Sequence, residues 1–251
     1  MPLDCRQTPV DRRGVNALRH AESHPTEWSK IVAYLDFLSP IHTRTKRDYL
    51  GRVNEFPKAE AAKLAKKFDF DYWDGDRKVG YGGYKYDGRW RTVADALAKH
   101  YGLKAGDRVL DVGCGKAFLL YDLTQAVPGL EVVGIDISRY GIEHAKEEVR
   151  PFLEVASAAK LPFADKSFDL IISINTLHNL FNFELDSALR EIERVGRKDK
   201  YIVVESYRNQ EEKANLLYWQ LTCESFCTPE EWQWWFDRCG YTGDHSFIYF
   251  E

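Results

Sequence analysis

A turn at residues 109–117, with the sequence VLDVGCGKA, has the residue types needed to hold a nucleoside cofactor. Gly113 and Gly115 allow the backbone to approach a ligand closely, and the helix that follows presents free N–H groups. Asp136 lies about 20 residues beyond Gly115, the spacing at which a carboxylate faces the hydroxyl groups of a ribose. The spacing therefore predicts a mononucleotide-type pocket.

Two residues of this region indicate the kind of cofactor. A dinucleotide-binding turn counted from Gly113 needs a third glycine at position 118, but Phe118 stands there and is too large for close packing of helix against strand. The carboxylate of Asp111 would repel a diphosphate and suits a cationic ligand better. We therefore do not expect nicotinamide-dependent hydride transfer.

From residue 93 onward the chain alternates helices and strands, and these elements must position the turn. We predict strands at residues 108–112, 131–135, 152–155, 169–174, 201–205 and 246–250, and helices at 93–100, 117–125, 139–149, 185–195 and 229–239. The strands are near-continuous runs of Val, Ile and Leu, which indicates burial on both faces. The pattern predicts an α/β fold, a Rossmann-like, doubly wound, mostly parallel sheet of six or seven strands with helices on both faces.

The N-terminal part of the chain has a different pattern. Residues 1–25 are polar and non-periodic and are expected to form a loosely ordered arm. Accessory helices are predicted at residues 27–38 and 57–68 from the spacing of their apolar side chains. We expect residues 1–92 to hold the arm, these helices and an aromatic lid, and residues 93–251 to form the cofactor-binding domain.

Residues 69–90, which we call the aromatic segment, combine glycines with large aromatic side chains. This composition suits a loop that covers a ligand, although ordinary packing of an aromatic loop on the core is an equally open interpretation. We hypothesise that residues 80–90 form a lid that the cofactor orders. The candidate residues for binding a substrate are Tyr81, Tyr84, Tyr86, Arg89 and, beyond the fifth strand, Tyr207.

With these motifs in order, the sequence resembles the class I S-adenosylmethionine-dependent methyltransferases, in particular the methyltransferase type 11-like group. The resemblance runs from about residue 104 to 205 and includes VLDVGCGKA, VVGID and LPFADKSFDLIIS. It implies S-adenosyl-L-methionine as the cofactor. It also implies that Gly113 and Gly115 hold the methionine part, that Asp111 orients its ammonium group, and that Asp136 binds both ribose hydroxyls.

The remaining cofactor contacts follow from the same resemblance. Ile137 would lie against the adenine, and Ser157 stands where the family usually has an Asp that accepts from the adenine amino group. Cys114, Ala158 and Asn175 complete the expected cofactor site. Two further departures concern the fold. The segment before the fifth strand, residues 194–200, is a basic loop without proline, and room remains for one strand at 246–250 where the family usually forms an antiparallel pair.

Methyl transfer from a sulfonium needs few catalytic residues, because the electrophile is already activated and the acceptor must mainly be held in line. The candidates are Asn175 and His178 after the fourth strand and Glu205 after the fifth. His178 has a pKa range suited to a general base, and a purely structural role for it is equally open. Glu205 could pair with an ammonium or guanidinium group, or form a surface salt bridge.

Composition limits the other functions. The 251 residues have a net charge of −4 and a pI of about 6.0, which argues against nucleic acid as a partner. Five scattered cysteines predict free thiols and no metal site, and the absence of a long apolar run predicts a cytoplasmic protein without a membrane partner.

We expect an enzyme that methylates a nitrogen or oxygen of a small molecule. Two alternatives stay open, a methyltransferase that acts on a protein or RNA and a catalytically silent cofactor-binding subunit. They are supported by the basic N-terminal part, where residues 1–104 hold 20 Lys and Arg against 14 Asp and Glu, and by the unusual Ser157 and 194–200 loop. The sequence does not predict the oligomeric state.

Overall fold

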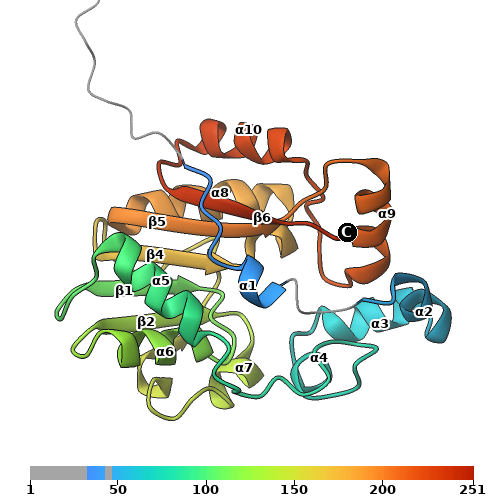
Figure 1. The fold of residues 1–251 in the computed structure, drawn as a ribbon, viewed down its shortest axis with the longest axis horizontal. Coiled ribbons are helices and arrows are strands. Elements are labelled where there is room, and N and C mark those ends of the chain that lie inside the picture. The colour runs from blue at the N-terminus through green and yellow to red at the C-terminus, as the bar shows by residue number, and fades with distance from the viewer. Residues whose placement is uncertain (1–32, 43–46) are drawn as a thin grey trace, which may run out of the picture. The chain divides into compact units, whose positions relative to one another are not determined.

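The centre of the fold is a six-stranded parallel sheet. A computed structural model describes residues 33–42 and 47–251, which lie in one compact unit of the chain. The strands are β1 (Arg108–Val112), β2 (Glu131–Asp136), β3 (Leu153–Val155), β4 (Phe168–Ile174), β5 (Gly196–Glu205) and β6 (Asp244–Ile248). Their order is β3-β2-β1-β4-β5-β6, and every strand pair in the described residues is parallel (Figure 1). The predicted α/β fold is confirmed, with six strands.

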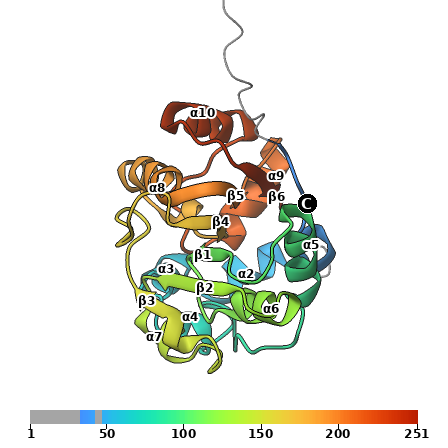
Figure 2. The same ribbon diagram turned by 90° about the vertical axis from the view of Figure 1, so that its left-hand side faces the viewer.

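Helices cover both faces of this sheet. They are α5 (Arg91–Tyr101), α6 (Phe118–Ala126), α7 (Arg139–Glu143), α8 (Asn182–Val195) and α10 (Pro229–Cys239), with short 3-10 turns η1 (Arg150–Phe152) and η2 (Leu177–Asn179). Successive strand residues point to opposite faces, so Val109 packs with α5 and α6, and Leu110 packs with α8 and α10. Figure 2 shows α5 and α6 on one side of the strands and α8 on the other.

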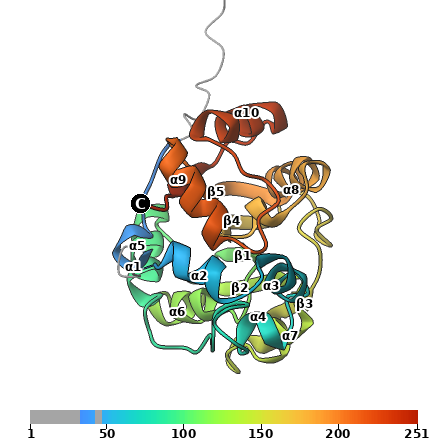
Figure 3. The same ribbon diagram turned by 90° about the vertical axis from the view of Figure 1, so that its right-hand side faces the viewer.

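The carboxyl ends of the strands are covered by elements from both ends of the chain. These are the accessory helices α1 (Ser39–His42), α2 (Tyr49–Glu55), α3 (Lys58–Ala65) and α4 (Phe70–Trp73), together with α9 (Gln210–Trp219). Helix α2 contacts α9, as Figures 1 and 3 both show. A small cluster of Ala61, Ala65, Val79 and Leu221 joins α3 to the aromatic segment and to the loop after α9. In doubly wound sheets this edge is where ligands bind.

The prediction of a helix at residues 27–38 is wrong for residues 33–38. Residues 27–32 lie outside the described residues, and from residue 33 the chain is extended. Tyr34 forms a parallel bridge with His245, and the Leu35 N–H donates to the His245 carbonyl over 2.9 Å. Because β6 is an edge strand with free backbone groups, pairing with it outweighs the helical spacing of the apolar residues.

The prediction of a basic loop at residues 194–200 is also wrong. Strand β5 begins at Gly196, directly after α8 ends at Val195. A side chain at Gly196 would place its Cβ 3.0 Å from the Ile192 carbonyl oxygen, so glycine permits the sharp change of direction. Lys200 is buried in the strand and pairs with Glu193 over 3.2 Å. This ion pair stabilises the lysine charge without exposure to solvent, so the segment can form a strand.

Other boundaries shifted by less. The last strand is Asp244–Ile248 instead of residues 246–250, and α7 ends at Glu143, well before residue 149. Helix α10 begins with a capping box, since Thr228 accepts from the Glu231 N–H and Glu231 accepts from the Thr228 N–H. Within the described ranges, no helix is both long and apolar enough to cross a membrane.

Candidate active site

The glycine turn lies at the carboxyl end of β1, braced by β2 and by the loop after β4. The N–H groups of Gly113 and Cys114 both donate to the Ile135 carbonyl, at 2.8 and 2.9 Å. Gly113 has φ of +87°, and a Cβ there would lie 1.9 Å from the Oγ1 of Thr176. Only glycine therefore allows this backbone conformation and this close approach together.

Asp136 holds the turn from the end of β2. Its carboxylate accepts the Gly115 N–H at 2.8 Å and the Ser138 N–H at 2.7 Å, and it is buried. Burial raises the pKa of Asp136, and the backbone N–H groups act against that rise. Each carboxylate oxygen keeps a further lone pair, so Asp136 can still accept hydrogen bonds from a ligand.

A cavity of about 470 Å³ opens beside this carboxylate. Six of the predicted cofactor residues line it, namely Gly113, Asp136, Ile137, Ser157, Ala158 and Asn175. Ile137 is 65% exposed, and with Phe181, which is also exposed, it offers apolar surface. The cavity thus combines a buried carboxylate with apolar walls, which fits a nucleoside.

The other three predicted cofactor residues, Asp111, Cys114 and Gly115, do not line this cavity. Asp111 is buried, and burial together with the nearby charge of Asp136 raises its pKa to about 7. In the described part of the chain, no hydrogen-bond donor reaches its carboxylate. Gly115 lies beneath the ring of Trp73, whose Cη2 would be 2.6 Å from an added Cβ.

The aromatic segment is tied to the glycine turn by buried polar contacts. Lys116 is buried and its Nζ lies 2.6 Å from Asp74 Oδ2, and the same Nζ donates to the Tyr84 carbonyl at 3.0 Å. Trp73 Nε1 donates to the Oγ of Ser138 at 2.8 Å. The Tyr84 ring stacks on Phe118 with 4.9 Å between ring centroids. The segment therefore packs directly over the turn.

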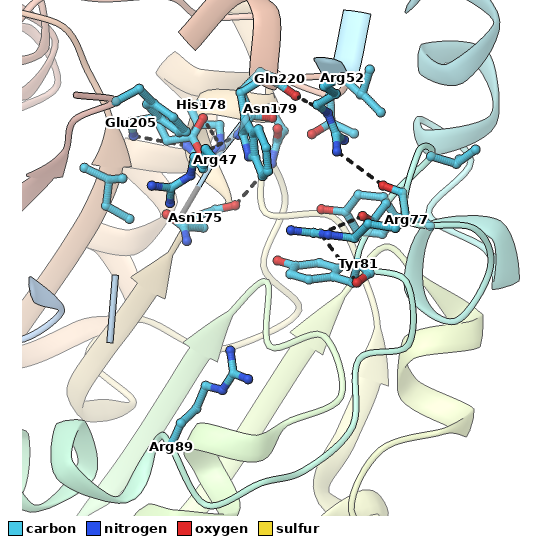
Figure 4. Close-up of a pocket in the computed structure, with 18 residues that line it drawn as sticks. Arg47, Arg52, Arg77, Tyr81, Arg89, Asn175, His178, Asn179, Glu205 and Gln220 are labelled. Atoms are coloured by element: carbon cyan, nitrogen blue, oxygen red, sulfur yellow. Dashed lines mark hydrogen bonds and ion pairs between the residues drawn. The ribbon is translucent and has the colours of Figure 1, made fainter. Parts of the chain in front are cut away.

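A second cavity, of about 210 Å³, adjoins the first (Figure 4). The two share five lining residues, namely Tyr72, Tyr81, Asn175, Asn179 and Thr222. Tyr81 stacks on Trp73 with an interplanar angle of 5°. Asn175 has φ of +58°, a strained conformation for a residue other than glycine, and such strain is common at functional sites. The shared wall is where groups bound in the two cavities would meet.

All three candidate catalytic residues, Asn175, His178 and Glu205, line this second cavity. His178 Nδ1 accepts the Glu205 backbone N–H at 3.3 Å, so the proton of the neutral ring lies on Nε2. That Nε2 is 3.4 Å from Glu205 Oε2. Glu205 Oε1 accepts from Gln220 Nε2. Burial lowers the pKa of His178 to about 3 and raises that of Glu205 to about 8.

Only some of the predicted substrate residues line a cavity of the site. Tyr81 and Arg89 line the second cavity. Tyr84, Tyr86 and Tyr207 line neither of the two cavities. Tyr86 donates to Asp122 on α6 at 2.6 Å, and Tyr207 is buried in the core.

Several cavity residues were not singled out from the sequence. They are Arg47, Arg52, Tyr72, Arg77, Asn179, Trp219, Gln220 and Thr222. Helix α2, which carries Arg52, has no buried residue and thus no apolar stripe that periodicity would detect. Trp219 stands beside other aromatic residues at helical spacing, a pattern that usually indicates packing.

Comparison with known proteins agrees with this geometry. A family model described as a methyltransferase domain matches residues 103–240, which is more than half of the chain. A demethylmenaquinone methyltransferase of Tropheryma whipplei is 36% identical over 116 residues, covering 44% of this chain and 46% of that protein. A 27-O-demethylrifamycin SV methyltransferase of Amycolatopsis mediterranei is 35% identical over 116 residues, covering 43% of this chain and 40% of that protein.

The chain thus spans less than half the length of these two curated relatives. Among solved structures, the [4+2]-cyclase SpnF superimposes with a TM-score of 0.50 at 23% identity, covering 67% of this chain and 61% of that one, which supports the fold alone. The family match, the ordered motifs and the parallel sheet agree, and the chain belongs to the class I S-adenosylmethionine-dependent methyltransferases.

Proposed function

We propose that this protein transfers a methyl group from S-adenosylmethionine to a nitrogen or oxygen atom of a small molecule held in the second cavity. The observation that carries the proposal is that the two cavities share a wall at Asn175 and Asn179. The cofactor supplies an electrophilic methyl group when bound. Asp136 and Ile137 would hold its ribose and adenine, with Ala158 and Ser157 beside the adenine.

Buried oxygens without a hydrogen bond in the second cavity support a methyl acceptor that carries an N–H or O–H group. Asn175 Oδ1, Asn179 Oδ1 and Glu205 Oε2 are buried and make no hydrogen bond with the described residues. Leaving such an oxygen unsatisfied costs about 1–3 kcal/mol, so a bound amine or alcohol that donates to it would be favoured. The same hydrogen bonds would orient the lone pair of the nucleophile toward the first cavity.

Glu205 is the group best placed to take the proton that the nucleophile loses. As the new carbon–nitrogen or carbon–oxygen bond forms and the carbon–sulfur bond breaks, one proton must leave the acceptor atom. His178 Nδ1 already accepts the Glu205 N–H and its Nε2 carries the ring proton, so the neutral ring has no free lone pair, whereas Glu205 Oε2 makes no hydrogen bond and lies 3.4 Å from that Nε2. We therefore assign His178 to positioning Glu205 and the proton-accepting role to the carboxylate.

The relatives named above support a small acceptor, because demethylmenaquinone and 27-O-demethylrifamycin SV are small molecules. The volume of the second cavity, about 210 Å³, also supports a small acceptor.

The test is transfer of label from methyl-labelled S-adenosylmethionine to a cell-metabolite extract split by size. We expect labelled product in the small-molecule fraction. Asp136→Asn should weaken cofactor binding measured by calorimetry, while Asp95→Asn, on the exposed surface of α5, should not. Label only in protein or RNA would favour the macromolecular alternative, and cofactor binding without transfer to any fraction would favour a silent subunit.

A further inference from the structure

Three guanidinium groups gather around one indole ring in the second cavity. Arg52 lies 4.5 Å from the centroid of the Trp219 ring, Arg77 lies 5.4 Å away and Arg47 lies 5.5 Å away. They come from α2, the aromatic segment and the chain just before α2, so no single local motif brings them together. Figure 4 shows Arg52 and Arg77 across the cavity from the side chains of His178 and Glu205.

Among the described residues, the half-buried Arg52 and the exposed Arg77 contact carbonyl groups and no carboxylate. Arg52 donates from Nε to the Trp219 carbonyl at 3.0 Å and from Nη1 to the Arg77 carbonyl at 3.2 Å, and Arg77 donates to the Gly80 carbonyl at 2.9 Å. In the described part of the chain, neither guanidinium has a carboxylate within 4.0 Å. Burial and the charge of Arg77 lower the pKa of Arg52 to about 10.

Most other arginines of the described chain pair with a carboxylate. Arg89, at the edge of the same cavity, binds Asp87 at 2.6 Å, Arg91 binds Asp95 at 2.9 Å, and Arg197 binds Asp169 at 2.6 Å. Two like charges held together without a counterion repel each other, and this arrangement is stabilised when an anion joins them. Guanidinium groups also offer paired N–H donors that match a carboxylate or phosphate.

We infer that the methyl acceptor carries an oxyanion, a carboxylate or a phosphate, which Arg52 and Arg77 bind beside Trp219. The inference rests on the proposed function and adds the class of its substrate. The acceptor is then a small molecule with two ends. Its anionic end lies at the arginines, and its N–H or O–H donor lies at Asn175, Asn179 and Glu205. The ring of Trp219 adds an apolar surface between the guanidinium groups.

The first experiment separates the metabolite extract by charge on an ion-exchange resin before adding labelled S-adenosylmethionine and the full-length chain. We expect label in the fraction retained as anions. Treatment of that fraction with a phosphatase distinguishes the two sources, because loss of labelling identifies a phosphate ester and survival identifies a carboxylate. Label only in neutral or cationic small molecules would overturn the inference while leaving the proposed function intact.

The second experiment measures binding of inorganic phosphate and of acetate to the protein with S-adenosylhomocysteine present, at constant ionic strength. We expect Arg52→Gln and Arg77→Gln each to weaken binding of the preferred anion about tenfold or more. Arg91→Gln is the matched control, because this arginine lies on α5 outside the cavity. Arg77→Lys keeps the charge and should recover part of the affinity.

S-adenosylhomocysteine affinity and the melting temperature are followed in the same samples. Unchanged cofactor affinity shows that a variant is folded, so a loss of anion binding is then specific. The inference would be overturned if phosphate and acetate each bound to Arg52→Gln and Arg77→Gln as tightly as to the wild type. Failure of S-adenosylhomocysteine to bind the wild type would instead count against the proposed function.

Discussion

His178 contacts Glu205 through both of its ring nitrogens, with the Glu205 backbone N–H donating to Nδ1 over 3.3 Å and the Nε2 lying 3.4 Å from Oε2. Because Nδ1 accepts from this N–H and Nε2 carries the proton, the neutral imidazole has no free lone pair with which to take a proton from a substrate. The pair places a carboxyl group of raised pKa in the second cavity. His178 therefore acts as a positioning residue in our proposal, and the two roles can be separated by mutation.

We expect the rate of methyl transfer to rise with pH and to level off above about 8, because the Glu205 carboxylate forms as pH passes its pKa of about 8. Glu205→Gln should lower the rate about 100-fold and remove this rise. His178→Gln keeps an N–H near Glu205 and should lose less activity while keeping a pH-dependent limb. If the rate still rose with pH in Glu205→Gln but no longer did so in His178→Gln, the two assignments would be reversed.

Cofactor binding should release a proton from Asp111 at pH 6. The pKa of this buried carboxyl is about 7, so below that pH it is mostly protonated, and an ammonium group bound beside it would favour the charged form. Calorimetry in two buffers of different ionisation enthalpy measures the release. Asp111→Asn should abolish the release and weaken binding, and Asp95→Asn serves as the control. Proton release that persists in Asp111→Asn would remove Asp111 from the cofactor site.

Gly113→Ala should destabilise the protein more than Gly106→Ala does. The two glycines have similar positive φ values, +87° and +84°, so both substitutions carry a left-handed backbone cost of about 1–2 kcal/mol. Nothing lies within 4 Å of a Cβ at Gly106, whereas at Gly113 it would lie 1.9 Å from Thr176 Oγ1. Denaturant unfolding measures the difference, and equal losses would show that the turn relaxes without cost.

The lid hypothesis predicts that S-adenosylhomocysteine slows amide exchange in residues 80–90, with α10 as an internal reference whose exchange does not change. Tyr84→Ala should lower turnover more than stability if the lid role dominates. The stack of Tyr84 on Phe118 and the hydrogen bond from Trp90 Nε1 to its hydroxyl also predict a measurable loss of stability. Equal exchange with and without S-adenosylhomocysteine would identify the segment as ordinary packing.

The sequence alone predicted the sheet, the glycine turn and Asp136, because those features depend on local patterns. Runs such as Leu170 to Ile172 have the composition of buried strands, and two glycines in a tight turn between a strand and a helix let the backbone approach a ligand closely. The same patterns misplaced residues 33–38 and 194–200. In both places pairing with a strand distant in sequence determined the backbone, namely β6 for residues 33–35 and β4 for residues 196–200.

What only the tertiary structure decided is the environment of side chains far apart along the chain. The sequence supplied His178 and Glu205 as candidates, but their hydrogen bonds and burial distinguish the proton acceptor from its support. Arg52 and Arg77 carry no signal in sequence, since an arginine on a helix without an apolar stripe or in a glycine-rich loop is ordinarily solvated. Folding brings both beside Trp219, 167 residues beyond Arg52, where the half-buried Arg52 and the exposed Arg77 line the same cavity.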